Sequence, residues 1–261
     1  MSATLPQLRA DLDFMPSPVE DRPGLLIRDS FRYSEALLII PPPLVACLQF
    51  FDGEHSESDL RDALFRMTGE LDLGPVIDHL KEMLSGSGFL EDERFQQMKH
   101  ARETEFAAMA VREPAHAGSA YPEEITELRG VMSAWMDGAG GGPRSHLKAS
   151  DLTGIAAPHV SPGGGYECYR AAYNLMGPEY RDRTFVVLGT SHYGAPNRFG
   201  ITRKPYSTPF GETVAALDLI EELLRHAPEA ITVEDYCHAV EHSIEFQVLF
   251  LQSIYGPDIR V

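Results

Sequence analysis

The stretch Thr184–Tyr193, TFVVLGTSHY, decides the fold that we expect for this chain. Its apolar run Phe185–Leu188 has the length and β-branched content of a strand, and it ends in small and polar residues just before His192. A second stretch at 152–160, LTGIAAPHV, repeats this order and ends at His159. Strands without a polar side are typical of a sheet covered by helices on both faces, so we predict a mixed α/β domain.

Both histidines fall where such a sheet usually binds its ligands. Side chains just past the carboxyl ends of strands line the ligand crevice of open α/β sheets, and His159 and His192 have that position. Neutral imidazoles are suitable ligands for iron, copper or zinc. A usable site needs at least a third ligand and an open position. The alternative for either residue alone is an ordinary hydrogen-bonded loop histidine.

A third polar cluster, EHSIEFQ at 241–247, follows DYCH at 235–238. The apolar residues beyond it predict a helix that starts near Glu241. At helical spacing Glu241 and Glu245 would share one face, and His238 and His242 another. The alternative is a polar helix start in which the carboxylate of Glu241 interacts favourably with the helix dipole.

The N-terminal part has a different pattern. Residues 24–92 predict two short strands around a polar turn, three helices with a cap at Ser56, and a closing strand FLED at 89–92. Strands, helices and strand in this order are typical of a small α+β winged-helix-like domain. Residues 1–23 would form an N-terminal arm, and the charged segment 93–113 a connecting helix that ends before a proline.

Composition narrows the function. The net charge of −17 over 261 residues disfavours nucleic acid as a partner, because phosphate neutralisation needs clustered Lys and Arg. The acidic charge and the absence of a long apolar run also argue against a membrane, and with no secretory signal we expect a cytoplasmic protein. The three cysteines have no metal-site or disulfide spacing. The glycine-rich stretch at 138–146 predicts a loop.

Five motifs in order carry a resemblance to a known family. They are AHAGSAYP (115–122), IAAPHV (155–160), VVLGTSHY (186–193), YSTPFGE (206–212) and EHSIEFQVLFL (241–251). Together they resemble the Memo family, known in bacteria and archaea as the Memo-like protein of the AmmeMemoRadiSam system. The resemblance covers 114–261, and the loop at 161–165 is longer and richer in glycine than the family pattern.

The resemblance implies a mixed-sheet fold similar to class III extradiol dioxygenases. It implies that His159 and His192 bind a metal, iron or copper with zinc as an alternative, and that Glu241 and His242 line the same cavity in supporting or proton-transfer roles. The family pattern continues past Val261, so we expect the N-terminal part of such a domain here. In that pattern the third ligand, a cysteine, and a further histidine come later.

The N-terminal part resembles PqqD-like peptide-recognition domains in the pattern of LLIIPPPLVACLQFFDGEHSESDL (37–60). Two functions remain open: a metal-dependent redox enzyme of the dioxygenase type, or a non-catalytic scaffold that presents a peptide to a partner, such as a radical SAM protein. A hydrolase is weaker, because the chain has neither a G-x-S-x-G elbow nor a P-loop. The oligomeric state is not readable from the sequence.

Overall fold

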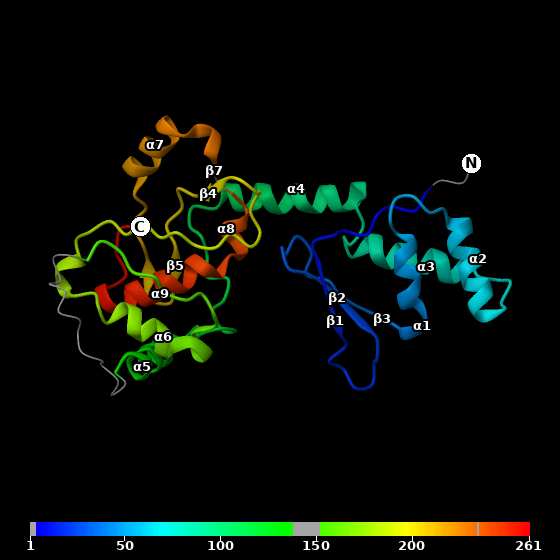
Figure 1. Cartoon of the computed structure of the whole chain (residues 1–261), viewed down its shortest axis with the longest axis horizontal. Helices are drawn as coiled ribbons and strands as arrows, with labels where there is room; N and C mark the ends of the chain where they lie inside the picture. Colours follow the sequence, from blue (N-terminus) through cyan, green and yellow to red (C-terminus); the bar gives the residue numbers. More distant parts are fainter. Residues whose placement is uncertain (1–3, 138–151, 234) are drawn as a thin grey trace. The chain divides into compact units, whose positions relative to one another are not determined.

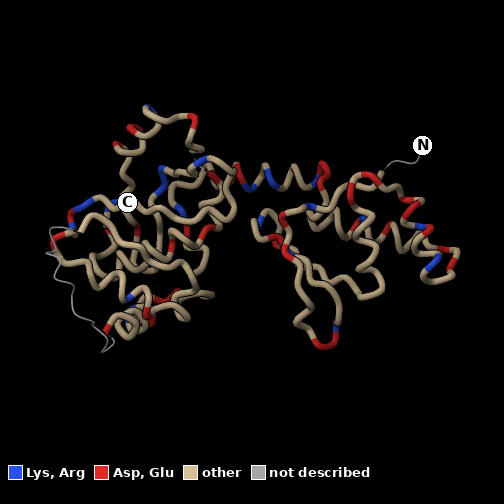
Figure 2. The backbone as a smooth tube through the Cα atoms, in the orientation of Figure 1, with Lys and Arg blue, Asp and Glu red and all other residues tan. Residues whose placement is uncertain are grey.

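The computed structural model describes residues 4–137, 152–233 and 235–261, so the predicted loop at 138–146 lies outside the described residues. The chain forms two compact units, Met1–Glu105 and Phe106–Val261. Their boundary falls within a helix that corresponds to the predicted connecting helix at 93–113. Acidic residues are spread over both units (Figure 2), as the net charge of −17 requires.

Unit 1 combines a three-stranded antiparallel sheet with helices (Figure 1). Its elements are β1 (Leu12–Pro16), β2 (Leu25–Asp29), β3 (Leu37–Ile40), α1 (Pro42–Val45), the 3-10 helix η1 (Ala46–Phe50), α2 (Glu57–Thr68), α3 (Gly74–Gly86) and α4 (Glu93–Ala108). The strand order is β1-β2-β3, and the register places Ile27 opposite both Phe14 and Leu38.

Two features of unit 1 differ from the sequence prediction. The segment 1–23 is more than an arm, because β1 within it pairs with β2 along its whole length. The predicted strand at 89–92 is reduced to a single bridge between Leu8 and Leu90. The carboxylate of Asp92 accepts a hydrogen bond from the backbone N–H of Phe95, so the chain turns into α4 before a strand can extend.

The ends of α2 follow directly from the local sequence. Ser56 is the N-cap, and its side chain and that of Asp59 each accept a hydrogen bond from the other's backbone N–H. Gly69 ends the helix at a φ of 73°, a left-handed conformation that favours glycine. Between these ends Leu60 and Leu64 are buried, whereas Phe65 and Met67 on the other side of the helix are exposed.

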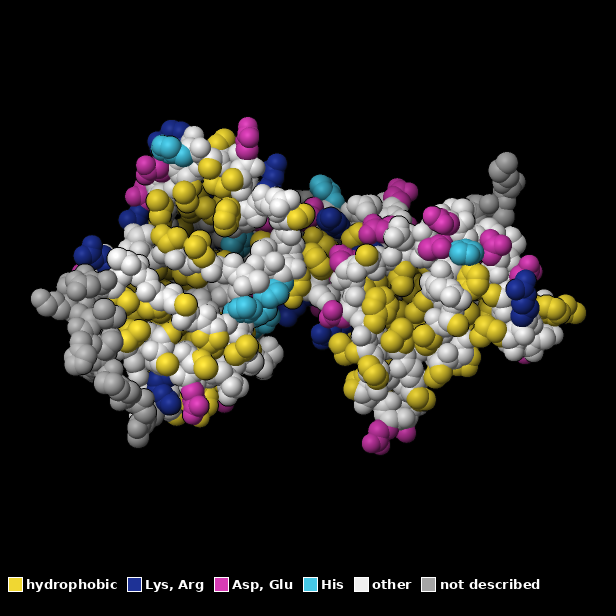
Figure 3. Space-filling view, viewed as in Figure 1, with side chains coloured by type: hydrophobic (Ala, Val, Ile, Leu, Met, Phe, Trp, Pro, Cys, Tyr) yellow, Lys and Arg dark blue, Asp and Glu magenta, His cyan; other side chains and the backbone are white. Residues whose placement is uncertain are grey.

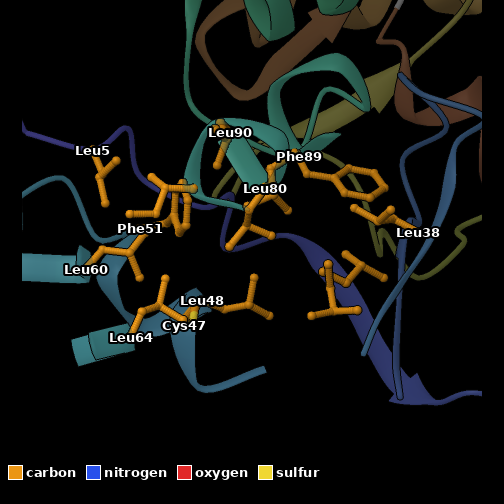
Figure 4. Close-up of a cluster of buried hydrophobic side chains, with 14 of the residues drawn as sticks. Leu5, Leu38, Cys47, Leu48, Phe51, Leu60, Leu64, Leu80, Phe89 and Leu90 are labelled. Atoms are coloured by element: carbon orange, nitrogen blue, oxygen red, sulfur yellow. The ribbon is translucent and has the colours of Figure 1, made fainter. Parts of the chain in front are cut away.

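The core of unit 1 is apolar and closed. It joins residues of all three strands to residues of η1, α2 and α3, and ten of its side chains are labelled in Figure 4: Leu5, Leu38, Cys47, Leu48, Phe51, Leu60, Leu64, Leu80, Phe89 and Leu90. Ile27 and Ile77 also belong to it and have no exposed surface. Burial of apolar area on this scale is the main source of stability for a unit of this size.

Unit 2 has more elements, most of them short (Figure 1). They are α5 (Ile125–Met136), α6 (Pro162–Tyr173), the 3-10 helix η3 (Pro178–Tyr180), β4 (Phe199–Ile201), β5 (Ser207–Thr208), β6 (Gly211–Glu212), α7 (Leu217–His226), the 3-10 helix η4 (Pro228–Ala230), β7 (Ile231–Val233), α8 (Cys237–Val240) and α9 (His242–Tyr255). Strands β4 and β7 are parallel, and β5 and β6 are antiparallel.

Helix α9 is the centre of unit 2. Phe246, Leu249 and Phe250 are buried on it, and they pack against residues of α5 and α6. The ring of Phe250 stacks on Tyr169 of α6, with 4.3 Å between the ring centroids. The helix begins at the position predicted from the sequence. No helix in the described residues of either unit is both long and apolar enough to cross a membrane.

The predicted strands at 152–160 and 184–193 are not formed, so the expectation of a sheet buried on both faces is wrong for these two segments. Within the described residues neither has a strand neighbour beyond one bridge between Thr184 and Arg260. One side of each segment packs on the core around α9, while Val186 and Leu188 on the other side are 68% and 82% exposed. The mixed α/β character of the chain stands.

Candidate metal centre

Three histidines from distant parts of unit 2 meet beside the N-terminus of α9. His159 precedes α6, His192 ends the extended segment 184–192, and His242 is the first residue of α9. One ring nitrogen from each lies within 4.8 Å of the others. Figure 3 shows a group of histidine side chains (cyan) at the surface of this unit. The two histidines that the sequence singled out as ligands therefore lie together.

The spacing fits a shared cation. The ring centroids are 5.3 Å apart for His159 and His192, 5.6 Å for His159 and His242, and 4.7 Å for His192 and His242. Two nitrogens bound to one metal at about 2.1 Å are at most about 4.2 Å apart. The ring nitrogens of the cluster, which lie within 4.8 Å of one another, are close to that limit. Three imidazoles are a donor set that suits zinc, copper and iron.

Glu241 fixes the orientation of His192. Its carboxylate accepts hydrogen bonds from the backbone N–H of His192, at 2.9 Å, and lies 3.0 Å from Nδ1 of the ring. With Nδ1 held as the donor, the lone pair of the neutral ring is on Nε2. A carboxylate on the far nitrogen is the usual partner of a metal-binding histidine. Glu241 therefore holds the ring of a candidate ligand, while the supporting and proton-transfer roles expected for it stay predictions.

Burial and hydrogen bonding act in opposite directions on Glu241. Burial disfavours its charge, but the backbone N–H groups of His192 and Ser243 and the ring of His192 donate to it, so its pKa lies below the ordinary value. The same carboxylate also accepts from the N–H of His242 and thus caps α9. The buried carboxylate of Glu241 therefore accepts hydrogen bonds from three backbone N–H groups, those of His192, His242 and Ser243.

His242 has a pKa below its ordinary value, mainly because burial disfavours the charged ring. A neutral imidazole is the form that binds a metal. The side chains of His192 and His242 are 34% and 24% exposed, so the cluster is open to solvent on one side. The sequence predicted His242 in this cavity as a proton-transfer candidate, and the geometry makes it a ligand candidate as well.

Side chains of α9 hold the two histidine-bearing segments. The amide of Gln247 donates to the carbonyl of Pro158, and the hydroxyl of Ser243 donates to the carbonyl of Thr190. The backbone at Gly189 lies so close to α9 that a Cβ there would be 2.5 Å from Oγ of Ser243. A glycine is needed at this contact, which brings the segment carrying His192 onto the helix.

A cavity of about 720 Å³ opens next to His159. It is lined by both histidine-bearing segments and by α9, with apolar groups such as Tyr173 and Leu188 and the polar side chain of Gln247. Most of its lining is apolar with a few polar groups, as is usual for small-molecule sites. A small ligand bound there would lie next to His159.

A buried polar network lies at the base of the site, and the sequence analysis did not find it. Arg112 and Glu245 form a fully buried ion pair. The carboxylate of Glu245 also accepts hydrogen bonds from the backbone N–H groups of Ala115 and His116 and from the hydroxyl of Tyr121. The signals in the sequence were an arginine three residues before the motif at 115–122 and an acidic residue, Glu245, within a largely apolar helix.

The prediction that Glu241 and Glu245, and likewise His238 and His242, share a face of one helix is wrong. His238 lies in α8, and the extended backbone of Glu241 separates it from α9. The Nδ1 of its ring lies 2.7 Å from the hydroxyl of Tyr206, away from His242. Glu245 points to Arg112 and does not share a site with the carboxylate of Glu241. The chain turns at Glu241 because this residue is the N-cap of α9.

Fold and site together define a class: an α/β protein with a helix-centred unit and a candidate metal site of three histidines. The sequence profile of the Memo-like proteins matches residues 112–261, which is the larger part of the chain and contains the whole cluster. The chain belongs to the Memo-like protein family.

Relatives of this chain are found among bacteria and archaea. A MEMO1 family protein of Aquifex aeolicus is 29% identical over 237 residues, 90% of this chain and 60% of the relative. Another, of Desulfurococcus amylolyticus, is 31% identical over 159 residues, 59% of this chain and 56% of the relative. A third, of Methanopyrus kandleri, is 31% identical over 57% of this chain and 54% of the relative. The chain spans little more than half the length of these relatives.

Proposed function

We propose that this chain carries a metal site for redox chemistry of the dioxygenase type, with iron or copper as the metal and zinc as an alternative. One observation carries the proposal: a ring nitrogen from each of His159, His192 and His242 lies within 4.8 Å of the others. A metal held by three imidazoles keeps open positions and can activate oxygen or polarise a bound substrate. A further ligand beyond Val261, expected from the family pattern, is compatible with such a site.

The protein's own groups have distinct roles in this proposal. The carboxylate of Glu241 lies 3.0 Å from Nδ1 of His192, which would leave Nε2 as the nitrogen that binds the metal. His242 is close enough to bind the metal directly, and when it is not bound its neutral ring can accept a proton from a substrate in the adjoining cavity.

Metal binding is the test of this site. Purified protein should bind about one Fe²⁺ or Cu²⁺ per chain, and replacing both His159 and His192 with alanine should abolish binding. The matched control is His226→Ala, because His226 is an exposed histidine of α7 in the same unit, with its Nδ1 2.8 Å from a backbone carbonyl. Unchanged metal content in the double variant would contradict the proposal, whatever activity is assayed.

The role of His242 can be separated from that of Glu241. His242→Ala should weaken metal binding strongly if the ring is a ligand, and Glu241→Gln should weaken it by about 10- to 100-fold, as loss of a carboxylate partner does at other sites. If the His242→Ala variant binds metal as tightly as the unchanged protein, His242 is not a ligand, and proton transfer is the role that is left for it.

We further propose that unit 1 is a winged-helix-like, PqqD-like module that recognises an extended peptide, and that the chain works within an AmmeMemoRadiSam-type system beside a radical SAM protein. This is the scaffold alternative from the sequence. One feature of the structure favours it: in the described part of the chain, no strand pairs with the outer edge of β3. An open strand edge can bind an extended peptide through main-chain hydrogen bonds.

A groove beside β3 would supply specificity. It has a volume of about 520 Å³ and lies between β3 and α3, where Leu38, Val76 and Met83 line it. Hydrophobic side chains (yellow) are gathered over the visible face of unit 1 in Figure 3. The exposed carboxylates of Asp78 and Glu82 lie on the same helix. The groove therefore fits an extended peptide with alternating apolar and basic side chains.

A designed peptide tests this function. An eight-residue peptide of alternating Val and Lys should bind the full chain in fluorescence anisotropy, and Val76→Lys should abolish binding because it puts a positive charge into the groove, against the lysines of the peptide. Phe65→Lys is the matched control, since Phe65 is 45% exposed on α2 of the same unit and lies outside the groove. Equal binding by the unchanged protein and by Val76→Lys would contradict the proposal.

A further inference from the structure

Arg112 has more partners than charge neutralisation requires. Besides the carboxylate of Glu245, its guanidinium donates to three backbone carbonyls: that of Glu113 at 2.9 Å, that of His238 at 2.7 Å, and that of Glu241 at 2.8 Å. The residue has no exposed surface. Arginine has a planar fork of five N–H donors, and a lysine could not reach the same set.

The carbonyls of His238 and Glu241 mark the two ends of one turn. This turn contains most of α8 and leads directly into the N-cap of α9. The backbone of Glu241 is therefore held by Arg112, while its carboxylate holds the ring of His192 and the N–H of His242. Glu241 is thus the single residue that connects the guanidinium of Arg112, through hydrogen bonds, to His192 and His242.

We propose that Arg112 is a positioning residue of the metal site. It sets the place of Glu241, and through Glu241 it sets the directions of His192 and His242. This inference rests on the proposed metal site, and it assigns a role to a residue outside the cluster. Loss of a supporting interaction one step from a ligand weakens metal binding by about 10- to 100-fold at other sites.

The variant Arg112→Lys separates positioning from charge. Lysine keeps a positive charge next to Glu245, but its single ammonium cannot hold the carbonyls of His238 and Glu241 together. With Co²⁺ alone as the probe, we expect affinity about 10-fold below that of the unchanged protein and an altered visible absorption spectrum, since the spectrum reports the ligand geometry. Circular dichroism establishes that the variant is folded.

Unit 1 offers the matched control, Arg9→Lys. Arg9 is also a fully buried arginine, and it donates to Asp11, to Asp29 and to the carbonyl of Gly88. Its replacement should lower stability to a similar degree and leave both the Co²⁺ affinity and the spectrum unchanged. A loss of affinity in this control would mean that destabilisation alone weakens the site, and it would overturn the proposal.

A second variant covers the case in which a lysine at 112 is not accommodated. Arg112→Gln combined with Glu245→Gln removes both charges of the pair and should also bind Co²⁺ more weakly. A folded variant of either kind with the affinity and spectrum of the unchanged protein overturns the proposal. So does the failure of both to fold, because Arg112 would then be a stability residue. If the unchanged protein binds no Co²⁺, the metal site itself is wrong.

Discussion

The two units of this chain differ in where they place a buried ion pair. In unit 1, Arg9 pairs with Asp29 beside an apolar core closed between the sheet and the helices. In unit 2 the carboxylate of the pair, Glu245, lies on the central helix itself, and its partner Arg112 comes from the first residues of the unit. Apolar periodicity therefore predicts most elements of the first unit, whereas the centre of the second also depends on a polar contact between residues more than a hundred positions apart.

The largest effect that we expect comes from breaking the polar contact in unit 2. Arg112→Met keeps a long side chain but leaves the buried Glu245 carboxylate without its charge partner, which should lower the free energy of unfolding by about 3–5 kcal/mol. Urea denaturation gives the magnitude, and hydrogen exchange followed by mass spectrometry shows which unit opens. A loss of protection in unit 1 would contradict the division into two independently stabilised units.

An apolar truncation in unit 1 should have a comparable but somewhat smaller effect. Ile77→Ala removes buried methylene and methyl groups from the closed core and should cost about 3 kcal/mol, within the usual range for such a change. Val76→Ala on the same helix is the matched control, because Val76 is 37% exposed and its truncation should cost less than about 1 kcal/mol. Equal losses from the two variants would show that the core of unit 1 is not closed as described.

The smallest effect should come from the exposed side of the segment 184–190. Leu188→Thr should change the free energy of unfolding of this chain by less than about 0.5 kcal/mol, since Leu188 is 82% exposed. The neighbouring Val187 packs against the core around α9, so Val187→Thr should cost about 1 kcal/mol or more. Thermal unfolding of the pair measures the difference, and a larger loss at Leu188 would mean that this face is buried in solution.

Much of unit 1 follows from local sequence. The two short apolar runs around a polar turn at 25–40 and the cap at Ser56 each act within a few residues, and the corresponding elements are present. The strands predicted at 152–160 and 184–193 are absent because an apolar run indicates that its side chains are buried, but not which element they pack against. In the described residues their neighbour is α9 on one side only, and their carbonyls at Pro158 and Thr190 bond to side chains of that helix.

Taken alone, the sequence singled out His159 and His192 as candidate metal ligands and predicted the start of a helix near Glu241. It also carried the resemblance to the Memo family, which the family profile supports. The sequence also predicted His242 in the same cavity, but only the tertiary structure decided that its ring nitrogen lies within 4.8 Å of those of His159 and His192, and that Arg112 donates to the carbonyl of Glu241. The physical reason is distance along the chain. Arg112 and Glu241 are separated by more than a hundred residues, and no local pattern encodes a hydrogen bond between groups that only folding brings together.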